Sequence, residues 1–188
     1  MSNDDTVEYV VSSLLNPRTW NIHVTPELIK FAEHLDRSKK TSKKRLVLAS
    51  DYELNGVIGQ YAVCQALGIE MDTKIYYGGD GGTDIKWKNL TIQVKSTPYS
   101  ISKDGGIPHL IFFNDEKYVA DVYILMITKN PQVTFAGWVT RQEVNVRTFA
   151  KSGFPPDYNG HTTRRVIPIK ALNDSIYNEI FQLKVDQI

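Results

Sequence analysis

The strongest hydrophobic pattern in the chain begins at residue 50. Side chains recur at the spacing of one side of a helix, which predicts a helix from Ser50 to about Leu67 that Gly68 ends. Gly56 and Gly59 inside this helix each cost roughly 1 kcal/mol relative to alanine. We therefore expect another part of the backbone to approach the helix closely there. The pattern is carried by Leu54, Val57, Ile58, Tyr61, Ala62, Gln65 and Ala66.

After this helix the pattern changes to short apolar or alternating segments of strand length. We expect Asp121–Thr128, which is almost wholly apolar, to be buried beside the hairpin formed by residues 84–96, with Asp121 as a strand-end residue rather than a ligand. A helix, a run of strands and further helices predict an α+β fold with a central mixed β-sheet flanked by helices. The other predicted strands are Lys74–Tyr77, Asp84–Trp87, Leu90–Ser96, Leu110–Phe113, Val133–Val139 and Arg165–Ile169, and the later helices are Arg141–Ala150 and Asp174–Leu183.

The first fifty residues favour a helical lead-in. Thr25-Pro26-Glu27 is typical of a helix start, with an N-cap, a first-turn proline and a first-turn acid. Residues 37–45 carry six positive charges without apolar periodicity, which predicts an exposed basic linker. We therefore divide a single domain of residues 1–188 into the lead-in (1–49), a core (50–140) and C-terminal helix and strand elements (141–188).

Length, charge and cysteine content limit which classes of protein this chain can belong to. The chain has 188 residues, enough for one sizeable core, and its formal net charge is only +1. A surface that binds anions must therefore come from local clusters of charge. The single cysteine, Cys64, predicts no internal disulfide and no cysteine-rich zinc site. The acidic N-terminus does not resemble a signal peptide and no apolar run reaches the ~18 residues of a membrane helix, so we expect a cytoplasmic protein without a membrane partner.

The candidate chemistry lies in the segment from residue 78 to residue 96. If Lys88-Asn89 forms a two-residue hairpin turn, Asp84 faces Gln93 across the two strands, and Lys95 follows on the same face. Facing residues have Cβ atoms roughly 4.5–5.5 Å apart. Two oxygen ligands and an ammonium group would then meet behind an apolar sheet face. That apolar face comprises Ile85, Trp87, Leu90, Ile92 and Val94.

These residue types suit hydrolysis of a phosphodiester. Asp84 would supply a charged oxygen ligand and Gln93 a neutral one to a hard cation such as Mg²⁺, which can acidify a bound water and offset charge on the phosphate. Lys95 can orient that water and stabilise negative charge in the transition state. Glu53, in the first turn of the predicted helix, would add a second carboxylate, although the helix dipole favours an acid there without any function.

Asp84 followed by Gln93-Val94-Lys95 resembles the PD-(D/E)XK nuclease motif. The run Gly78-Gly-Asp-Gly-Gly-Thr-Asp84 and the glutamine at position 93 resemble Mrr-type restriction endonucleases in particular. The resemblance covers roughly residues 50–139 and implies a restriction-endonuclease-like fold. It also implies a Mg²⁺-dependent deoxyribonuclease, which we expect to be an endonuclease. Mn²⁺ is expected to substitute for Mg²⁺. Asp84, Gln93 and the Val94 carbonyl would bind the metal, Lys95 would position the water and Glu53 would support the metal shell.

The chain departs from the family pattern at two positions. Thr83 stands in place of the proline that precedes the aspartate, and Gln93 replaces the more usual acid, which removes one negative charge from the metal site. A nucleic-acid-binding protein that has the fold but no activity is therefore one alternative. A structural or assembly protein of a mobile element, in which the C-terminal third does the work, is the other.

Several residues outside the motif are candidates for contacts with DNA. Backbone without side chains at Gly81 and Gly82 would let a phosphate approach the metal. Basic side chains of the predicted linker and of a second basic spot would bind phosphates without reading sequence. A solvated surface explains the same residues equally well. Many members of the resembled superfamily act as dimers, so a homodimer is one arrangement that would cut both strands. The basic candidates are Lys39, Lys40, Lys43, Lys44, Arg164 and Arg165.

Overall fold

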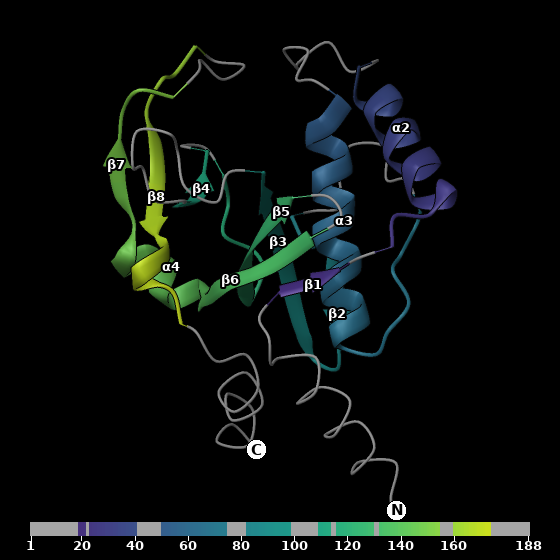
Figure 1. Cartoon of the computed structure of the whole chain (residues 1–188). Coiled ribbons are helices and arrows are strands. Elements are labelled where there is room, and N and C mark those ends of the chain that lie inside the picture. Colours follow the sequence, from purple (N-terminus) through teal and green to yellow (C-terminus); the bar gives the residue numbers. More distant parts are fainter. Residues whose placement is uncertain are drawn as a thin grey trace, which may run out of the picture.

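The computed structural model describes residues 19–21, 23–40, 50–74, 82–98, 109–113, 116–129, 132–154 and 160–173. Its larger sheet has the strand order β1-β6-β5-β3-β2, in which β3 and β5 are parallel and the other neighbours antiparallel. A smaller antiparallel sheet has the order β4-β8-β7 (Figure 1). The expected α+β architecture with a central mixed sheet is confirmed. The strands are β1 (Thr19–Asn21), β2 (Ile85–Trp87), β3 (Leu90–Thr97), β4 (His109–Phe112), β5 (Val122–Lys129), β6 (Gln132–Thr140), β7 (Phe149–Lys151) and β8 (Arg164–Pro168).

The helices are α2 (Pro26–Lys40), α3 (Ser50–Ala66) and α4 (Arg141–Arg147), with a short 3-10 turn, η1, at Ile169–Ala171. Helix α3 lies against the larger sheet and α2 packs on α3 (Figure 1). Helix α3 ends where the sequence predicts, because Gly68 has a φ of +66° and the N–H of Ile69 donates to the carbonyl of Cys64 at 3.0 Å. None of the described helices is long and apolar enough to cross a membrane.

Strand β5 is buried on both faces. Val122, Ile124 and Met126 belong to the core cluster formed with α3, whereas Tyr123 and Leu125 belong to a second cluster formed with β4 and β8. This division follows from the alternation of side chains along a strand. The expectation that this apolar strand is buried beside the hairpin is confirmed, since β5 pairs with β3. The larger sheet is therefore packed between α3 and the smaller sheet.

The β2–β3 hairpin has the predicted turn. Ile85 pairs with Ile92, and Lys88-Asn89 connects the two strands. Lys88 adopts the positive φ of the turn, 53°, and is the one described non-glycine residue that does so. The apolar side chains of both strands pack on α3 as expected. The predicted register is thus present from the turn to the pair Ile85 and Ile92.

Asp121 connects three elements at the start of β5. Its carboxylate accepts hydrogen bonds from the backbone N–H of Thr91 at 2.9 Å and from the hydroxyl of Thr91 at 2.7 Å. Its own N–H donates to the Thr91 carbonyl at 2.9 Å, and its carbonyl accepts from the N–H of Arg141, also at 2.9 Å. Asp121 therefore joins β3 and β5 to α4 and is the strand-end residue that the sequence predicts.

Three elements differ from the sequence-based expectation. Thr19–Asn21 is a strand within the predicted helical lead-in, because it pairs with the edge of β6, a partner more than a hundred residues away. Helix α2 continues through residues 37–40, where we predicted an exposed linker. Arg and Lys are good helix formers, although this stretch has no apolar periodicity. The remainder of that basic run lies outside the described residues.

The third difference concerns the segment after β6. The predicted helix Arg141–Ala150 ends at Arg147, and Phe149 begins strand β7. Thr148 is extended and its hydroxyl accepts a hydrogen bond from Arg165, while Phe149 pairs with Val166. Pairing with β8 therefore overrides the local helical tendency. The predicted strand at Lys74–Tyr77 is not formed at Lys74, and its other residues and the helix Asp174–Leu183 lie outside the described residues.

The two glycines inside α3 have different surroundings. A Cβ added at Gly59 would overlap the Oγ of Ser96 and lie 3.2 Å from the Cβ of Ser96 and 3.3 Å from that of Met126, whereas one added at Gly56 would meet nothing within 4 Å. Close approach, expected at both positions, therefore holds only at Gly59, and there the neighbours are side chains of β3 and β5.

These surroundings predict opposite effects of the same substitution. We expect Gly56→Ala to raise the free energy of unfolding by roughly 0.5–1 kcal/mol, because alanine favours the helix. We expect Gly59→Ala to lower it by about 1–2 kcal/mol, because two strands must move away. Urea denaturation followed by circular dichroism measures both values. Equal stabilisation by the two substitutions would show that α3 does not lie as close to β3 as described.

Candidate functional site

Asp84 lies just before β2, where the hairpin becomes irregular. Its N–H donates to the carbonyl of Ile92 at 2.9 Å, although Ile92 is already the ladder partner of Ile85. Its carboxylate Oδ2 accepts the N–H of Val94 at 2.6 Å. The expectation that Asp84 stands across from Gln93 in a regular ladder is therefore wrong in detail. The carboxylate instead binds the backbone of β3 between Gln93 and Lys95.

Gln93 and Lys95 occupy the face of β3 that does not pack on α3. The buried positions of β3 alternate with them, which places both on the same face. The side-chain oxygen Oε1 of Gln93 is buried and has no hydrogen-bond partner among the described residues. An unsatisfied buried oxygen of this kind costs about 1–3 kcal/mol. A neutral amide oxygen of this kind is among the ligands that a hard cation takes.

Lys95 is paired with a carboxylate that the sequence did not suggest. Its ammonium Nζ lies 2.5 Å from Oε1 of Glu116, and the two side chains are 23% and 13% exposed. The other carboxylate oxygen of Glu116 accepts the N–H of Phe113 at 3.1 Å. The ammonium also lies 5.7 Å from the ring centroid of Phe112. Lys95 is therefore held in one place by a charge, a ring and partial burial.

Glu116 was missed because nothing in its local sequence separates it from a solvated loop. It lies in Asn-Asp-Glu-Lys, a run of charged and polar residues between two predicted strands. Its position next to Lys95 depends on the loop between β4 and β5 turning back over β3. A contact across 21 residues of chain carries no periodic signal that one sequence could reveal.

Helix α3 contributes Gln60 to the site. The side-chain amide of Gln60 donates to the carbonyl of Asp84 at 3.0 Å. Glu53 lies seven residues earlier in α3, on the same side of the helix and roughly 10 Å away along its axis. The side chain of Glu53 lies outside the described part of the chain, so its support of a metal shell stays a prediction. The contact that α3 makes with Asp84 comes from Gln60.

The candidate DNA-binding residues fall into three groups. Gly82 has a φ of +84°, and a Cβ there would lie 2.8 Å from Cγ2 of Val119, so packing already accounts for this glycine. Lys39 and Lys40 end α2, and nothing is described of their side chains. Gly81, Lys43 and Lys44 lie outside the described residues. Contact of these residues with DNA stays a prediction.

Arg164 and Arg165 both bind within the protein. Arg164 is 5% exposed, and its Nη1 donates to the carbonyls of His161 and Thr163 at 2.6 and 3.0 Å. Arg165 is half-buried, donates to the hydroxyl of Thr148 at 2.5 Å and lies 5.5 Å from the ring of Tyr118. Burial favours a structural role for Arg164 over direct contact with a phosphate.

Comparisons with known proteins identify no relative: no protein-family model, no curated protein and no solved structure matches the chain. Within the described ranges, no group of three or more His, Cys, Asp or Glu side chains could hold a metal ion. A metal site built on β3 from described residues would combine the carboxylate of Asp84 with the amide oxygen of Gln93. The case for a function rests on the geometry at β3.

Cys64 lies on α3, one turn after Gln60, and is buried. Burial, and to a lesser degree the negative charge of Asp84, raises the pKa of its thiol from 9.0 to about 12. A thiol with such a pKa stays protonated at neutral pH and is a poor nucleophile. Cys64 is therefore not a candidate catalytic residue.

The raised pKa predicts slow alkylation of the folded protein. At about pH 8.5, near the ordinary thiol pKa, iodoacetamide should modify Cys64 roughly 100-fold more slowly in buffer than in denaturant, because folding both buries the thiol and removes the thiolate. Intact mass spectrometry over time measures the two rates. Similar rates in both solutions would contradict the burial of Cys64 beside Asp84.

Proposed function

We propose that this chain is a metal-dependent nuclease that hydrolyses DNA phosphodiester bonds, built on a restriction-endonuclease-like fold. The arrangement that supports the fold is the order of its parts: helix α3, the β2–β3 hairpin and strand β5 parallel to β3. The observation that supports nuclease activity is the side-chain oxygen Oε1 of Gln93, which is buried and has no hydrogen-bond partner among the described residues. The carboxylate of Asp84 accepts the N–H of the next residue, Val94, and Lys95 follows two residues after Gln93.

In this proposal Asp84 and Gln93 hold a divalent cation such as Mg²⁺ or Mn²⁺. When bound, the cation supplies positive charge to the scissile phosphate and acidifies a water. The N–H of Val94 fixes the Asp84 carboxylate, and Gln60 fixes the backbone of the same residue. The ammonium of Lys95 offsets negative charge that develops on the phosphate oxygens. These side chains are ordered before a substrate arrives, which lowers the cost of reaching the transition state.

Glu116 acts through Lys95. A carboxylate 2.5 Å from an ammonium and also bonded to the N–H of Phe113 restricts the lysine side chain to one rotamer. The lysine would otherwise lose conformational entropy on binding a substrate. Glu116 is therefore a positioning residue in this site, and its own oxygens need not touch the DNA.

A second candidate function is DNA binding without cleavage. Two observations favour it: Gln93 brings no negative charge to a metal, and the charge of Lys95 is already balanced by Glu116. Both weaken a catalytic site while leaving the fold intact. Cleavage assays separate the two functions directly.

We expect the purified protein to nick supercoiled plasmid in Mg²⁺ or Mn²⁺ and to be inactive in EDTA. Lys95→Ala should lower the rate roughly 100- to 1000-fold, the usual effect of removing a group that stabilises transition-state charge. Lys86→Ala is the matched control, because Lys86 is an exposed lysine of the same hairpin and should leave the rate unchanged. Agarose-gel kinetics measure the rates. DNA binding without nicking in either metal would replace the nuclease with the second candidate function.

A double-mutant cycle tests the role of Glu116. If Glu116 acts only through Lys95, Glu116→Gln should lower the nicking rate roughly 10-fold, and adding it to Lys95→Gln should change nothing further. Glu116→Asp should recover part of the loss. A merely structural role predicts that the two losses multiply and that thermal unfolding shifts in step with activity. Differential scanning fluorimetry of each variant supplies that comparison.

A further inference from the structure

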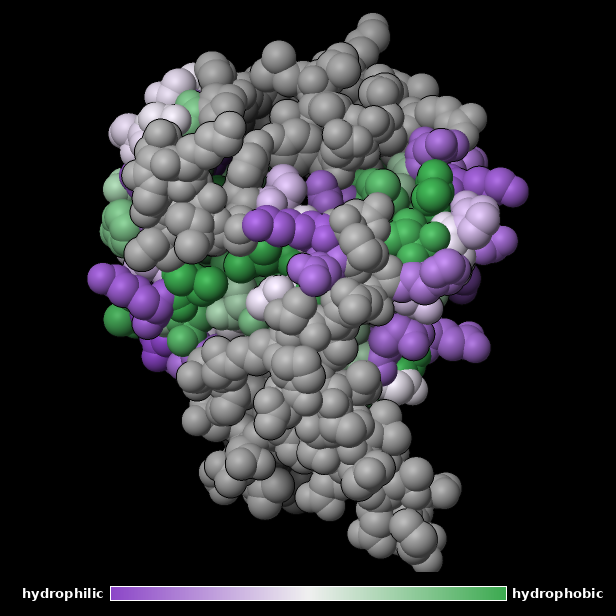
Figure 2. All heavy atoms as spheres, in the orientation of Figure 1, coloured by the Kyte–Doolittle hydropathy of each residue, from purple (hydrophilic) through white to green (hydrophobic). Residues whose placement is uncertain are grey.

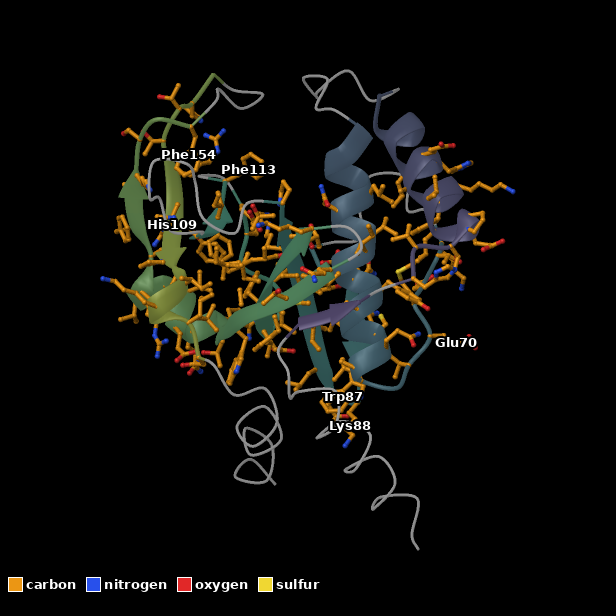
Figure 3. The ribbon with its side chains drawn as sticks, in the orientation of Figure 1. Glu70, Trp87, Lys88, His109, Phe113 and Phe154 are labelled. Carbon is orange, nitrogen blue, oxygen red and sulfur yellow. The ribbon has the colours of Figure 1, made fainter. Side chains whose placement is uncertain are left out.

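Arg164 lies between two phenylalanine rings at one end of the smaller sheet. Its guanidinium carbon is 5.1 Å from the ring centroid of Phe113 and 6.0 Å from that of Phe154. Hydrogen bonds to the carbonyls of His161 and Thr163 fix the guanidinium from the other side. Figure 3 shows Phe113 and Phe154 at the same end of the sheet, away from the hairpin turn at Lys88.

Phe113 is exposed although it is held in place. It is 38% exposed, while the neighbouring Phe112 is fully buried. A phenylalanine at the surface whose ring is fixed by a cation offers a flat apolar surface at little entropic cost. Val146 and Phe149 are more exposed, at 85% and 48%, but no cation is described against either side chain. Figure 2 shows hydrophobic residues at the surface where Figure 1 places α4 and β7.

Two contacts connect Phe113 to the candidate site. Its N–H donates to one carboxylate oxygen of Glu116, and the other oxygen of Glu116 pairs with Lys95. The two oxygens of one carboxylate therefore bind the backbone of Phe113 and the ammonium of Lys95. A ligand that reached the candidate site from this end of the sheet would pass the ring.

Two basic residues of the smaller sheet lie at this end of the molecule. Arg164 lies against the ring of Phe113. Lys151 is exposed and is the register partner of Arg164 across β7 and β8. Aromatic faces with nearby cations bind single-stranded nucleic acid, because every base has a face that can stack and every nucleotide a phosphate. Bases inside a duplex are already stacked and do not offer that face.

We propose that Phe113, held on Arg164, stacks on an unpaired base of the DNA substrate, so that this chain acts on DNA with a single-stranded segment next to the cleaved bond. This inference rests on the proposed nuclease function and specifies its substrate class. Arg164 is here the support of the ring, and phosphate contacts come from exposed cations such as Lys151. In this proposal the smaller sheet contributes to substrate binding.

Fluorescence anisotropy with a labelled oligo-dT and a labelled hairpin duplex, both in EDTA so that nothing is cleaved, tests the proposal. We expect the wild-type protein to prefer oligo-dT. Phe113→Leu should weaken oligo-dT binding roughly 5- to 100-fold, the range expected for one lost base stack, and leave duplex binding unchanged. Phe113→Tyr should retain binding. Phe149→Leu, at an exposed phenylalanine without a described cation, is the matched control and should behave as wild type.

Two other outcomes have separate meanings. Unchanged oligo-dT binding by Phe113→Leu, or equal losses for Phe113→Leu and Phe149→Leu, would overturn the stacking role even if the wild-type protein nicks plasmid. A loss specific to Phe113→Leu in a protein that cleaves no DNA would support the stacking surface and refute the nuclease.

Discussion

The pairing of β3 with β5 is the interaction on which the candidate site depends. Strand β5 is buried on both faces and pairs with β3. This pairing fixes the register of β3 and also holds β3 against the interior of the protein. One face of β3 is then committed to α3, and the other face must carry Gln93 and Lys95 toward the smaller sheet. A polar face that would be solvated in an isolated hairpin becomes half-buried in this sheet. Because this face is partly buried, individual charged groups and oxygen atoms on it have specific partners.

Local patterns predicted the elements that contain the site, and long-range contacts explain what they missed. The helix from Ser50 and the turn at Lys88-Asn89 follow from periodicity and turn chemistry, and both are present. The irregular ladder at Asp84 could not be foreseen, because it depends on a side chain replacing a backbone partner for Val94. Glu116 and strand β1 depend on loops that bring distant segments together. Sequence periodicity indicates which face of a helix or strand a residue occupies, but it does not reveal contacts between distant segments.

The charges of the candidate site are arranged so that few are left without a partner. Asp84 binds a backbone N–H, Lys95 binds Glu116, and Gln93 has the one buried oxygen that lacks a donor among the described residues of the site. A glutamine at position 93 fits this balance. A carboxylate there would add a second negative charge to the strand that binds Asp84, with no further cation described beside it. In the proposed metal site, the neutral oxygen would avoid that repulsion without a metal and would attract a bound cation less strongly.

The hydrogen bonds of Asp121 have a consequence for the mechanics of the molecule. One residue joins the first turn of α4, the beginning of β5 and the second residue of β3, all at the end of the strands where the hairpin begins. Lys95 stands four residues farther along β3, about 13 Å from that junction. Because α4 leads directly into β7, this junction also links the larger sheet to the smaller one. Any separation of the two sheets would therefore be largest at the opposite end, which holds Glu116 and Phe113.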